Sequence, residues 1–144
     1  MTYIMDSPTE GKRLEEKTDA ERVERELRWM GIAPGLDVLE VGCGTGAVTR
    51  AAARLATLGR VVGVDASASR LEQAQAFAAT EQLACTFTQA QATALPFAAN
   101  FDLTYARMLF EYLEEPQQAL QQMIKATRPG GTVAVADLDS QILS

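Results

Sequence analysis

The sequence predicts an α/β fold in which parallel strands alternate with helices, and two observations carry this prediction. Short apolar runs bounded by turn residues alternate along the chain with longer segments of helical apolar spacing. One of the runs ends in a turn with glycines at positions 42, 44 and 46, and a helix-forming segment follows directly. Strands separated by helices indicate right-handed crossovers and a parallel sheet. With 144 residues, 47% of them apolar, the chain is expected to form one domain with a substantial core.

Two short helices are expected before the first strand. The first begins with the capping box Ser7-Pro8-Thr9-Glu10, and the second begins with the capping box Thr18-Asp19-Ala20-Glu21. The apolar positions behind the second box share one helical face: Val23, Leu27 and Met30. Gly31 ends this helix, and the mixed charge of its other positions is typical of a solvated face. We therefore expect a helical segment over residues 1–31 that lies against a larger domain over residues 32–144.

Five strands and three further helices are expected in the larger domain. The strands are predicted at Asp37–Val41, Val61–Val64, Ala84–Thr88, Phe101–Tyr105 and Thr132–Ala136. The helices are predicted to begin near Ala47, Ser67 and Pro116, and the first of them to run to about Leu58 before Gly59. The inward positions of the last two helices are predicted to be Leu71, Ala74, Ala78, and Leu120, Met123, Ile124. Residues 89–100 are expected to form a loop, and Pro129-Gly130-Gly131 a turn before the fifth strand.

The glycine turn after the first strand predicts a nucleotide-cofactor site, because glycine permits a positive φ and lets a ligand lie against the main chain. The pattern Gly42-x-Gly44-x-x-Ala47, with Asp65 ending the second strand, formally satisfies the dinucleotide-binding fingerprint. Asp65 is placed to accept hydrogen bonds from the ribose hydroxyls of any adenosine cofactor. Its structural alternative is an acid that complements the dipole of the following helix.

Glu40 distinguishes between the kinds of cofactor that the glycine turn could bind. An acid two residues before the first glycine repels a pyrophosphate, but it attracts a cationic group. S-adenosylmethionine carries both a protonated amine and a positive sulfonium, so Glu40 favours this cofactor over a dinucleotide. The structural alternative for Glu40 is a strand-end carboxylate that faces water.

The composition limits the kinds of partner that the chain can bind and the cell compartment in which we expect it. The formal net charge is −6, and the basic residues after position 31 are scattered among acids, so no basic patch is available for nucleic acid. The chain has no histidine, which excludes a His-containing zinc site and a histidine base, and Cys43 and Cys85 have no metal-ligand spacing. No apolar stretch approaches the roughly 20 residues that span a bilayer, and charged residues interrupt any signal-peptide core. We expect a cytoplasmic protein without a metal, a membrane span or a nucleic-acid partner.

Five motifs in register resemble those of class I S-adenosylmethionine-dependent methyltransferases, in the small-molecule group of ubiquinone/menaquinone-type and type 11/25 enzymes. The motifs are Val38–Gly46, Val61–Asp65, Gln91–Phe97, Phe101–Leu113 and Arg128–Gly131. The resemblance implies a Rossmann-like three-layer sandwich with N-terminal helices and a parallel sheet of about five strands in the order 3-2-1-4-5. It also implies S-adenosylmethionine as the cofactor and methyl transfer to a small-molecule acceptor.

The resemblance further assigns cofactor contacts to residues at the strand ends. These are Glu40 for the methionine amine, the backbone at Gly42, Gly44 and Gly46 for methionine and ribose, Asp65 for the ribose hydroxyls, Ala66, Gln91 and Ala92 for the adenine, and Arg107 for the methionine end. Gln91 stands where the family usually has an acid, so its attraction for the adenine amino group is weaker. Tyr3 and Arg13 are candidates for an N-terminal segment that folds over the cofactor.

No catalytic base is assigned. The cofactor brings its own activation, so the protein mainly aligns the reacting atoms and excludes water. Tyr105, Glu111 and Tyr112 are the candidates should the acceptor need to lose a proton, but each is expected to serve in packing or support.

The sequence stops soon after the fifth strand, where the family pattern continues with a helix and an antiparallel strand pair. The implied strand order leaves Thr132–Ala136 as a bare edge, so we expect either a fragment of a longer enzyme or an edge that another copy covers. A cofactor-binding module without turnover is therefore the alternative function. An NAD-type oxidoreductase is a third, disfavoured by Glu40 and by the Leu-Pro-Phe and Pro-Gly-Gly turns.

Overall fold

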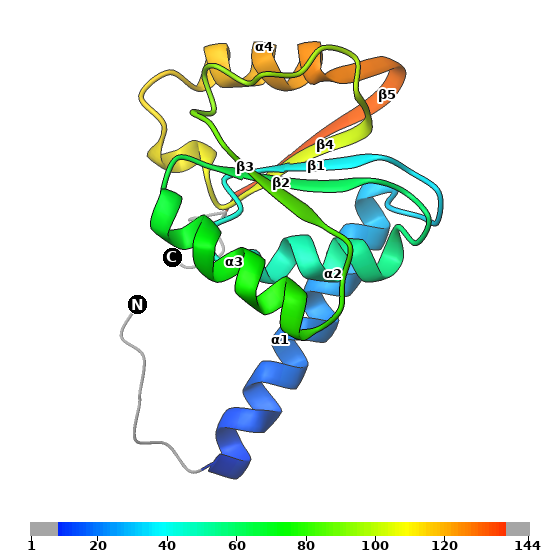
Figure 1. The fold of residues 1–144 in the computed structure, drawn as a ribbon, viewed down its shortest axis with the longest axis vertical. Helices are drawn as coiled ribbons and strands as arrows, with labels where there is room; N and C mark the ends of the chain where they lie inside the picture. The colour runs from blue at the N-terminus through cyan, green and yellow to red at the C-terminus, as the bar shows by residue number, and fades with distance from the viewer. Residues whose placement is uncertain (1–8, 138–144) are drawn as a thin grey trace, which may run out of the picture.

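The computed structural model describes residues 9–137, and they form a five-stranded parallel sheet in the order β3-β2-β1-β4-β5 (Figure 1). This order confirms the expectation from the motifs. The strands are β1 (Val38–Val41), β2 (Val61–Asp65), β3 (Thr86–Gln89), β4 (Phe101–Arg107) and β5 (Thr127–Ala136). The helices are α1 (Thr9–Met30), α2 (Ala47–Leu55), α3 (Ala68–Thr80), the short 3-10 helix η1 (Phe110–Tyr112) and α4 (Pro116–Ala126).

Helices cover both faces of the sheet and give it three layers. α1, α2 and α3 lie on one face, and α4 lies on the other (Figure 1). The chain runs outward from β1 to β2 and β3, and then returns to the other side of β1 to form β4. This reversal makes the carboxyl ends of β1 and β4 the switch point of the sheet, where open α/β proteins bind their ligands.

Two clusters of buried apolar residues lie on opposite faces of the sheet, and β1 contributes to both because both of its faces are covered. Val38 packs with α1 and α2, whereas Leu39 packs with residues of α4, and both side chains are 0% exposed. A parallel strand buried on both faces needs a nearly continuous apolar sequence. Within this strand Glu40 is the exception, and it too is buried.

The N-terminal region is one continuous helix, so the prediction of two short helices is wrong. α1 passes without a break through Thr18-Asp19-Ala20-Glu21, which contains no glycine or proline to stop a helix. A capping box is compatible with a helix start, but it does not end the helix that precedes it. The predicted apolar face is confirmed, since Leu27 and Met30 are buried and Val23 is half-buried against the core. Among the described residues, no helix is long and apolar enough to cross a membrane.

The fifth strand begins earlier than predicted, and the Pro-Gly-Gly turn is a bulge within it. Thr127 already pairs with Phe101, and the register then shifts so that Leu103 pairs with Thr132. Gly130 adopts a φ of 84°, and a Cβ at Gly131 would lie 2.5 Å from a backbone oxygen. The bulge therefore depends on both glycines, and in the described structure β5 pairs with β4 alone.

The bulge also places Arg128 where it closes the amino-terminal end of the sheet. Its guanidinium contacts Asp37 and Asp102, each at 2.9 Å. Asp37 also accepts a hydrogen bond from the backbone of Arg60, and this bond and Arg128 hold the pKa of Asp37 below its usual value. Arg128 thus ties the residue before β1 to the start of β4, at the end of the sheet opposite the glycine turn.

Two of the helices differ from prediction in their details. α2 ends at Leu55 rather than near Leu58. α4 turns its small residues toward the sheet, so Ala119 and Ala126 are buried beside Met123. Leu120 and Ile124, which were expected to face inward, are 37% and 56% exposed. Small residues at these positions let the helix lie close to the strands, and the larger apolar residues are displaced to its flank. The inward face predicted for α3 is confirmed.

The rotation of α4 predicts unequal effects for two neighbouring truncations. Met123→Ala removes a side chain that is 0% exposed and should lower the free energy of unfolding by about 2–4 kcal/mol. Ile124→Ala removes an exposed side chain and should cost less than about 1 kcal/mol. Urea denaturation of both variants measures these values. A larger loss for Ile124→Ala than for Met123→Ala would contradict the orientation of α4.

Candidate functional site

The glycine turn connects β1 to α2 with three left-handed residues. Gly42, Gly44 and Gly46 have φ values of 76°, 57° and 82°. The backbone N–H groups of Gly42 and Cys43 both donate to the carbonyl of Val64, at 2.7 and 2.9 Å. The turn is therefore fixed to the end of β2, and side chains other than glycine would be strained at each of its three positions.

The three glycines differ in what surrounds them. A Cβ at Gly42 would lie 2.8 Å from the Leu109 side chain, and a Cβ at Gly46 would lie 3.0 Å from Phe87. A Cβ at Gly44 would meet nothing within 4 Å. Gly42 and Gly46 thus allow close packing beneath the turn, whereas Gly44 presents open backbone on which a ligand can lie.

Asp65 ties the glycine turn to the start of α3. One carboxylate oxygen accepts a hydrogen bond from the Gly44 N–H at 3.0 Å, and the other accepts one from the Ser67 N–H at 3.0 Å. Each oxygen has a second lone pair, so the carboxylate can accept further hydrogen bonds from a ligand. Ala66 is exposed beside it, and its carbonyl accepts a hydrogen bond from Gln89. Asp65 therefore holds the backbone of Gly44 in place, and its remaining lone pairs can accept hydrogen bonds from a ligand beside that glycine.

Glu40 lies beneath this turn and is almost completely removed from solvent. Its side chain is 3% exposed and accepts a hydrogen bond of 2.5 Å from the Thr49 hydroxyl on α2. Burial is the largest influence on the carboxyl and raises its pKa to about 7. Glu40 therefore changes charge close to neutral pH, and its ionised form is available to a cationic partner.

Arg107 ends β4 on the same side of the molecule. Its Nε and Nη2 atoms both donate to the carboxylate of Glu26 on α1, each at 3.0 Å. This bidentate pair raises the pKa of Arg107, and both side chains are largely buried. The mixed charge of this helix predicted a solvated face, and that prediction did not include a buried partner role for Glu26. The available signal was its spacing, three residues after Val23 and four before Met30, which places it at the edge of the apolar face of the helix.

Gln91 and Ala92 follow β3 and line a cavity of about 330 Å³. The opposite wall of this cavity comes from residues 112–115, which begin with the last residue of η1. Asp65 pairs with Gln89, so Gln91 lies only two residues beyond the strand that neighbours the Asp65 carboxylate. The structure thus places the residues predicted for the adenine next to those predicted for the ribose.

The remaining predicted side chains divide into buried and exposed groups. Tyr105 is 0% exposed, and burial raises its pKa well above its ordinary value, so its hydroxyl does not act as a base near neutral pH. Burial likewise raises the pKa of Cys43 to about 12. Glu111 and Tyr112 are exposed. Tyr3 and the side chain of Arg13 lie outside the described residues.

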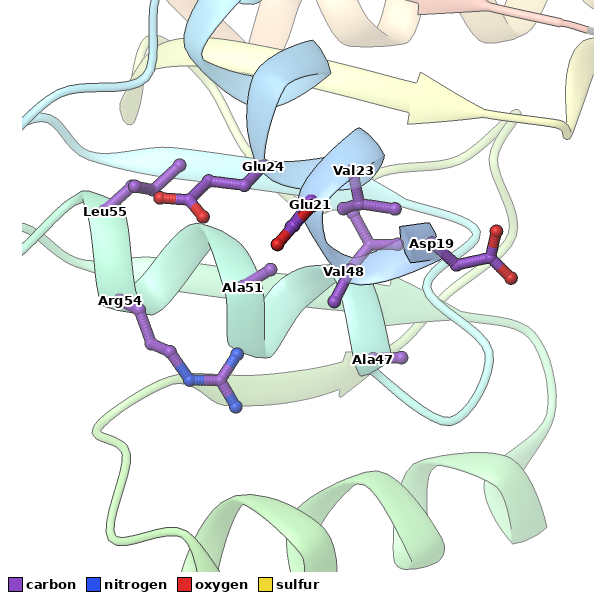
Figure 2. Close-up of a pocket in the computed structure, with 10 residues that line it drawn as sticks. Asp19, Glu21, Val23, Glu24, Ala47, Val48, Ala51, Arg54 and Leu55 are labelled. Carbon is purple, nitrogen blue, oxygen red and sulfur yellow. The ribbon is translucent and has the colours of Figure 1, made fainter. Parts of the chain in front are cut away.

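A larger cavity of about 480 Å³ lies between α1 and α2 (Figure 2). Figure 2 shows Val23 of α1 and Val48 and Ala51 of α2 among the apolar side chains of its walls. Among the described residues that line it, none is a predicted cofactor contact. The open glycine, the Asp65 acceptor and the buried acid converge instead at the strand ends, and we place the candidate site there.

Comparison with known proteins identifies the family. A model described as a methyltransferase domain matches residues 38–131, which is more than half of the chain. The chain is 36% identical over 124 residues to the O-methyltransferase resE of Aspergillus sclerotiorum, covering 82% of this chain and 46% of the relative. It is 33% identical over 112 residues to the ubiquinone/menaquinone biosynthesis C-methyltransferase UbiE of Bdellovibrio bacteriovorus, covering 77% of this chain and 48% of the relative.

A solved structure agrees with these relatives. The S-adenosylmethionine dependent methyltransferase from Mesorhizobium loti superposes with a TM-score of 0.66 at 29% identity, covering 76% of this chain and 50% of that chain. The present chain spans less than half the length of the two curated relatives. Its matched region contains β1 to β4 and the glycine turn. The chain therefore belongs to the class I S-adenosylmethionine-dependent methyltransferases.

Proposed function

We propose that this protein binds S-adenosylmethionine at the carboxyl ends of β1 to β4 and transfers its methyl group to a small-molecule acceptor. The observation that carries the proposal is the open backbone of Gly44, which is held by Asp65 and lies above a buried acid. The bound cofactor supplies an activated methyl group on a sulfonium, and the acceptor supplies the electron pair that forms the new bond.

The nucleoside is expected to lie across the ends of β1, β2 and β3. Asp65 holds the ribose hydroxyls with the lone pairs that its two backbone bonds leave free. The adenine lies near Ala66 and in the cavity lined by Gln91 and Ala92. The backbone from Gly42 to Gly46 supports the methionine and the ribose.

The methionine end is expected to lie over β1 and β4. The ionised carboxylate of Glu40 attracts the ammonium group, directly or through water. Arg107 borders this end with its main chain, because Glu26 holds both donor atoms of its guanidinium that face α1. The residues of this chain thus orient the cofactor and exclude water, and no base is required of them.

A small-molecule acceptor is supported by the relatives named as an O-methyltransferase and a ubiquinone/menaquinone C-methyltransferase. The net charge of −6 disfavours nucleic acid as the acceptor. The match to the methyltransferase-domain model disfavours an NAD-type oxidoreductase.

A cofactor-binding module without turnover is the alternative, because the chain spans less than half of the relatives' length. Within the described structure, β5 has one partner strand and its Val135 is 42% exposed. An unpaired edge of this kind can pair with another strand. We propose self-association through this edge as a further property, which light scattering of the purified chain tests.

The cofactor assignment predicts a selective thermal shift. S-adenosylhomocysteine at about 100 times its dissociation constant should stabilise the fold by about 2.7 kcal/mol and raise the melting temperature, whereas NAD should not. Asp65→Ala should abolish the shift, while Glu72→Ala, an exposed acid on α3, should retain it. Circular dichroism verifies that both variants fold. A shift that persists in Asp65→Ala would refute the ribose assignment.

The open space above Gly44 predicts that a single methyl group blocks the ligand. Gly44→Ala and Gly130→Ala both place alanine at a positive φ with nothing within 4 Å of the new Cβ. Both should therefore destabilise the fold by about 1–2 kcal/mol through backbone strain. Only Gly44→Ala should weaken the binding of S-adenosylhomocysteine, measured by titration calorimetry. Equal affinities of the two variants would place the ligand elsewhere.

The raised pKa of Glu40 predicts that binding depends on pH. Because the ammonium needs the ionised carboxylate, the affinity for S-adenosylhomocysteine should increase about tenfold between about pH 6 and about pH 8. In the ligand-free protein the sign is opposite, since an acid whose pKa is raised on folding stabilises the fold below its unfolded value of 4.5, and this contribution is lost as pH rises through about 7.

Glu40→Gln is the control for this pH dependence. The variant should bind S-adenosylhomocysteine weakly and with the same affinity at each pH. Calorimetry of both proteins in buffers of equal ionic strength gives the comparison. If Glu40→Gln kept the slope of the original protein, another group would be responsible for it.

A further inference from the structure

A row of polar side chains lies on the face of the sheet that α1 and α2 cover. Glu40 pairs in register with Tyr105, so both side chains point to the same face. Arg107 is two residues beyond Tyr105 and shares that face. Glu26 approaches the row from α1, and Thr49 approaches it from α2. The row therefore crosses the switch point of the sheet, underneath the candidate methionine site.

Arg107 stands between two carboxylates in this row. It makes both of its close contacts with Glu26, at 3.0 Å each. Its charge also acts on Glu40, where it lowers the pKa of the buried carboxyl. Glu40 itself receives a hydrogen bond from Thr49, while the Tyr105 hydroxyl beside it is buried and has no partner of normal hydrogen-bond geometry among the residues that the structure describes. The Glu40 carboxylate is thus close to a cation that is directed away from it.

We propose that Glu26 is a positioning residue that holds Arg107 toward α1 and so keeps the Glu40 carboxylate available to the ammonium group of the cofactor. The inference rests on the proposed function. Two cations cannot both pair closely with one buried carboxylate without repelling each other. Among the described residues, Glu40 is the other carboxylate whose charge acts on Arg107, so without Glu26 the guanidinium competes with the ligand for Glu40.

The competing explanation is that the Glu26–Arg107 pair only fastens α1 to the sheet. A fastening role affects every ligand of the site to a similar extent, because it acts on the fold. Competition for Glu40 affects only ligands that carry an ammonium group. A pair of adenosine ligands that differ in this group therefore separates the two roles.

Titration calorimetry with S-adenosylhomocysteine and 5′-methylthioadenosine makes this comparison, since the second compound lacks the amino-acid end. Glu26→Ala preserves a good helix former in α1 and should weaken S-adenosylhomocysteine about tenfold, leaving 5′-methylthioadenosine unchanged. The double variant Glu26→Ala/Arg107→Gln removes the competing cation and should recover most of the lost affinity. Glu24→Ala removes the same charge from the exposed side of α1, where Glu24 pairs with Arg28, and should bind both compounds normally.

Glu26→Gln, which removes the charge and keeps the size, provides the same test should Glu26→Ala be too unstable to titrate. Equal weakening of both compounds would overturn the inference in favour of a fastening role. Failure of the double variant to recover affinity for S-adenosylhomocysteine would overturn it as well. If the unmodified protein bound neither compound, the proposed function itself would fail, and the inference would fail with it.

Discussion

The Asp65 carboxylate is the constraint on which the site depends. β1 and β2 run side by side in parallel, with Val41 opposite Val64, so both strands end at the same edge of the sheet. The chain leaves β1 through left-handed glycines, whose backbone is held by the Val64 carbonyl and then by Asp65. The second oxygen of Asp65 fixes the entry to α3. One side chain thus sets the relative positions of the turn, the neighbouring strand and the following helix.

Beneath the glycine turn, the packing of the core buries charged side chains, so packing and electrostatics depend on each other. Glu40 is buried in a strand that must be apolar on both faces, and a short hydrogen bond from Thr49 compensates part of that burial. Arg107 and Glu26 satisfy each other nearby, which balances two further charges at low exposure. A buried carboxylate near an ion pair lowers the stability of the fold. Its presence is understandable where a cationic ligand binds there and balances its charge.

The sequence alone predicted the sheet, and the position proposed for the site follows from the same local patterns. The apolar runs, the three glycines and the acids at the strand ends are contiguous in the chain, and the motifs supplied the strand order. Glu26 was missed, because its partner Arg107 is 81 residues away and its position beside the apolar face of α1 does not by itself identify that partner. The predicted rotation of α4 about its own axis was also wrong. Helical spacing fits either Leu120 or Ala119 as an inward residue, and the closeness of the helix to the sheet decides between them. The contacts of Arg128 depend similarly on two aspartates that are distant in the chain.

Amide chemical-shift mapping by NMR distinguishes a ligand at the strand ends from a ligand elsewhere on the molecule. Titration of the isotope-labelled protein with S-adenosylhomocysteine reports on each backbone N–H separately. We predict the largest changes at Gly44, in the segment after Asp65 and at Ala92, with smaller changes along the walls of the cavity between α1 and α2. Changes concentrated at Val23, Val48 and Ala51, with Gly44 unaffected, would place the ligand in that cavity and refute a cofactor site at the glycine turn.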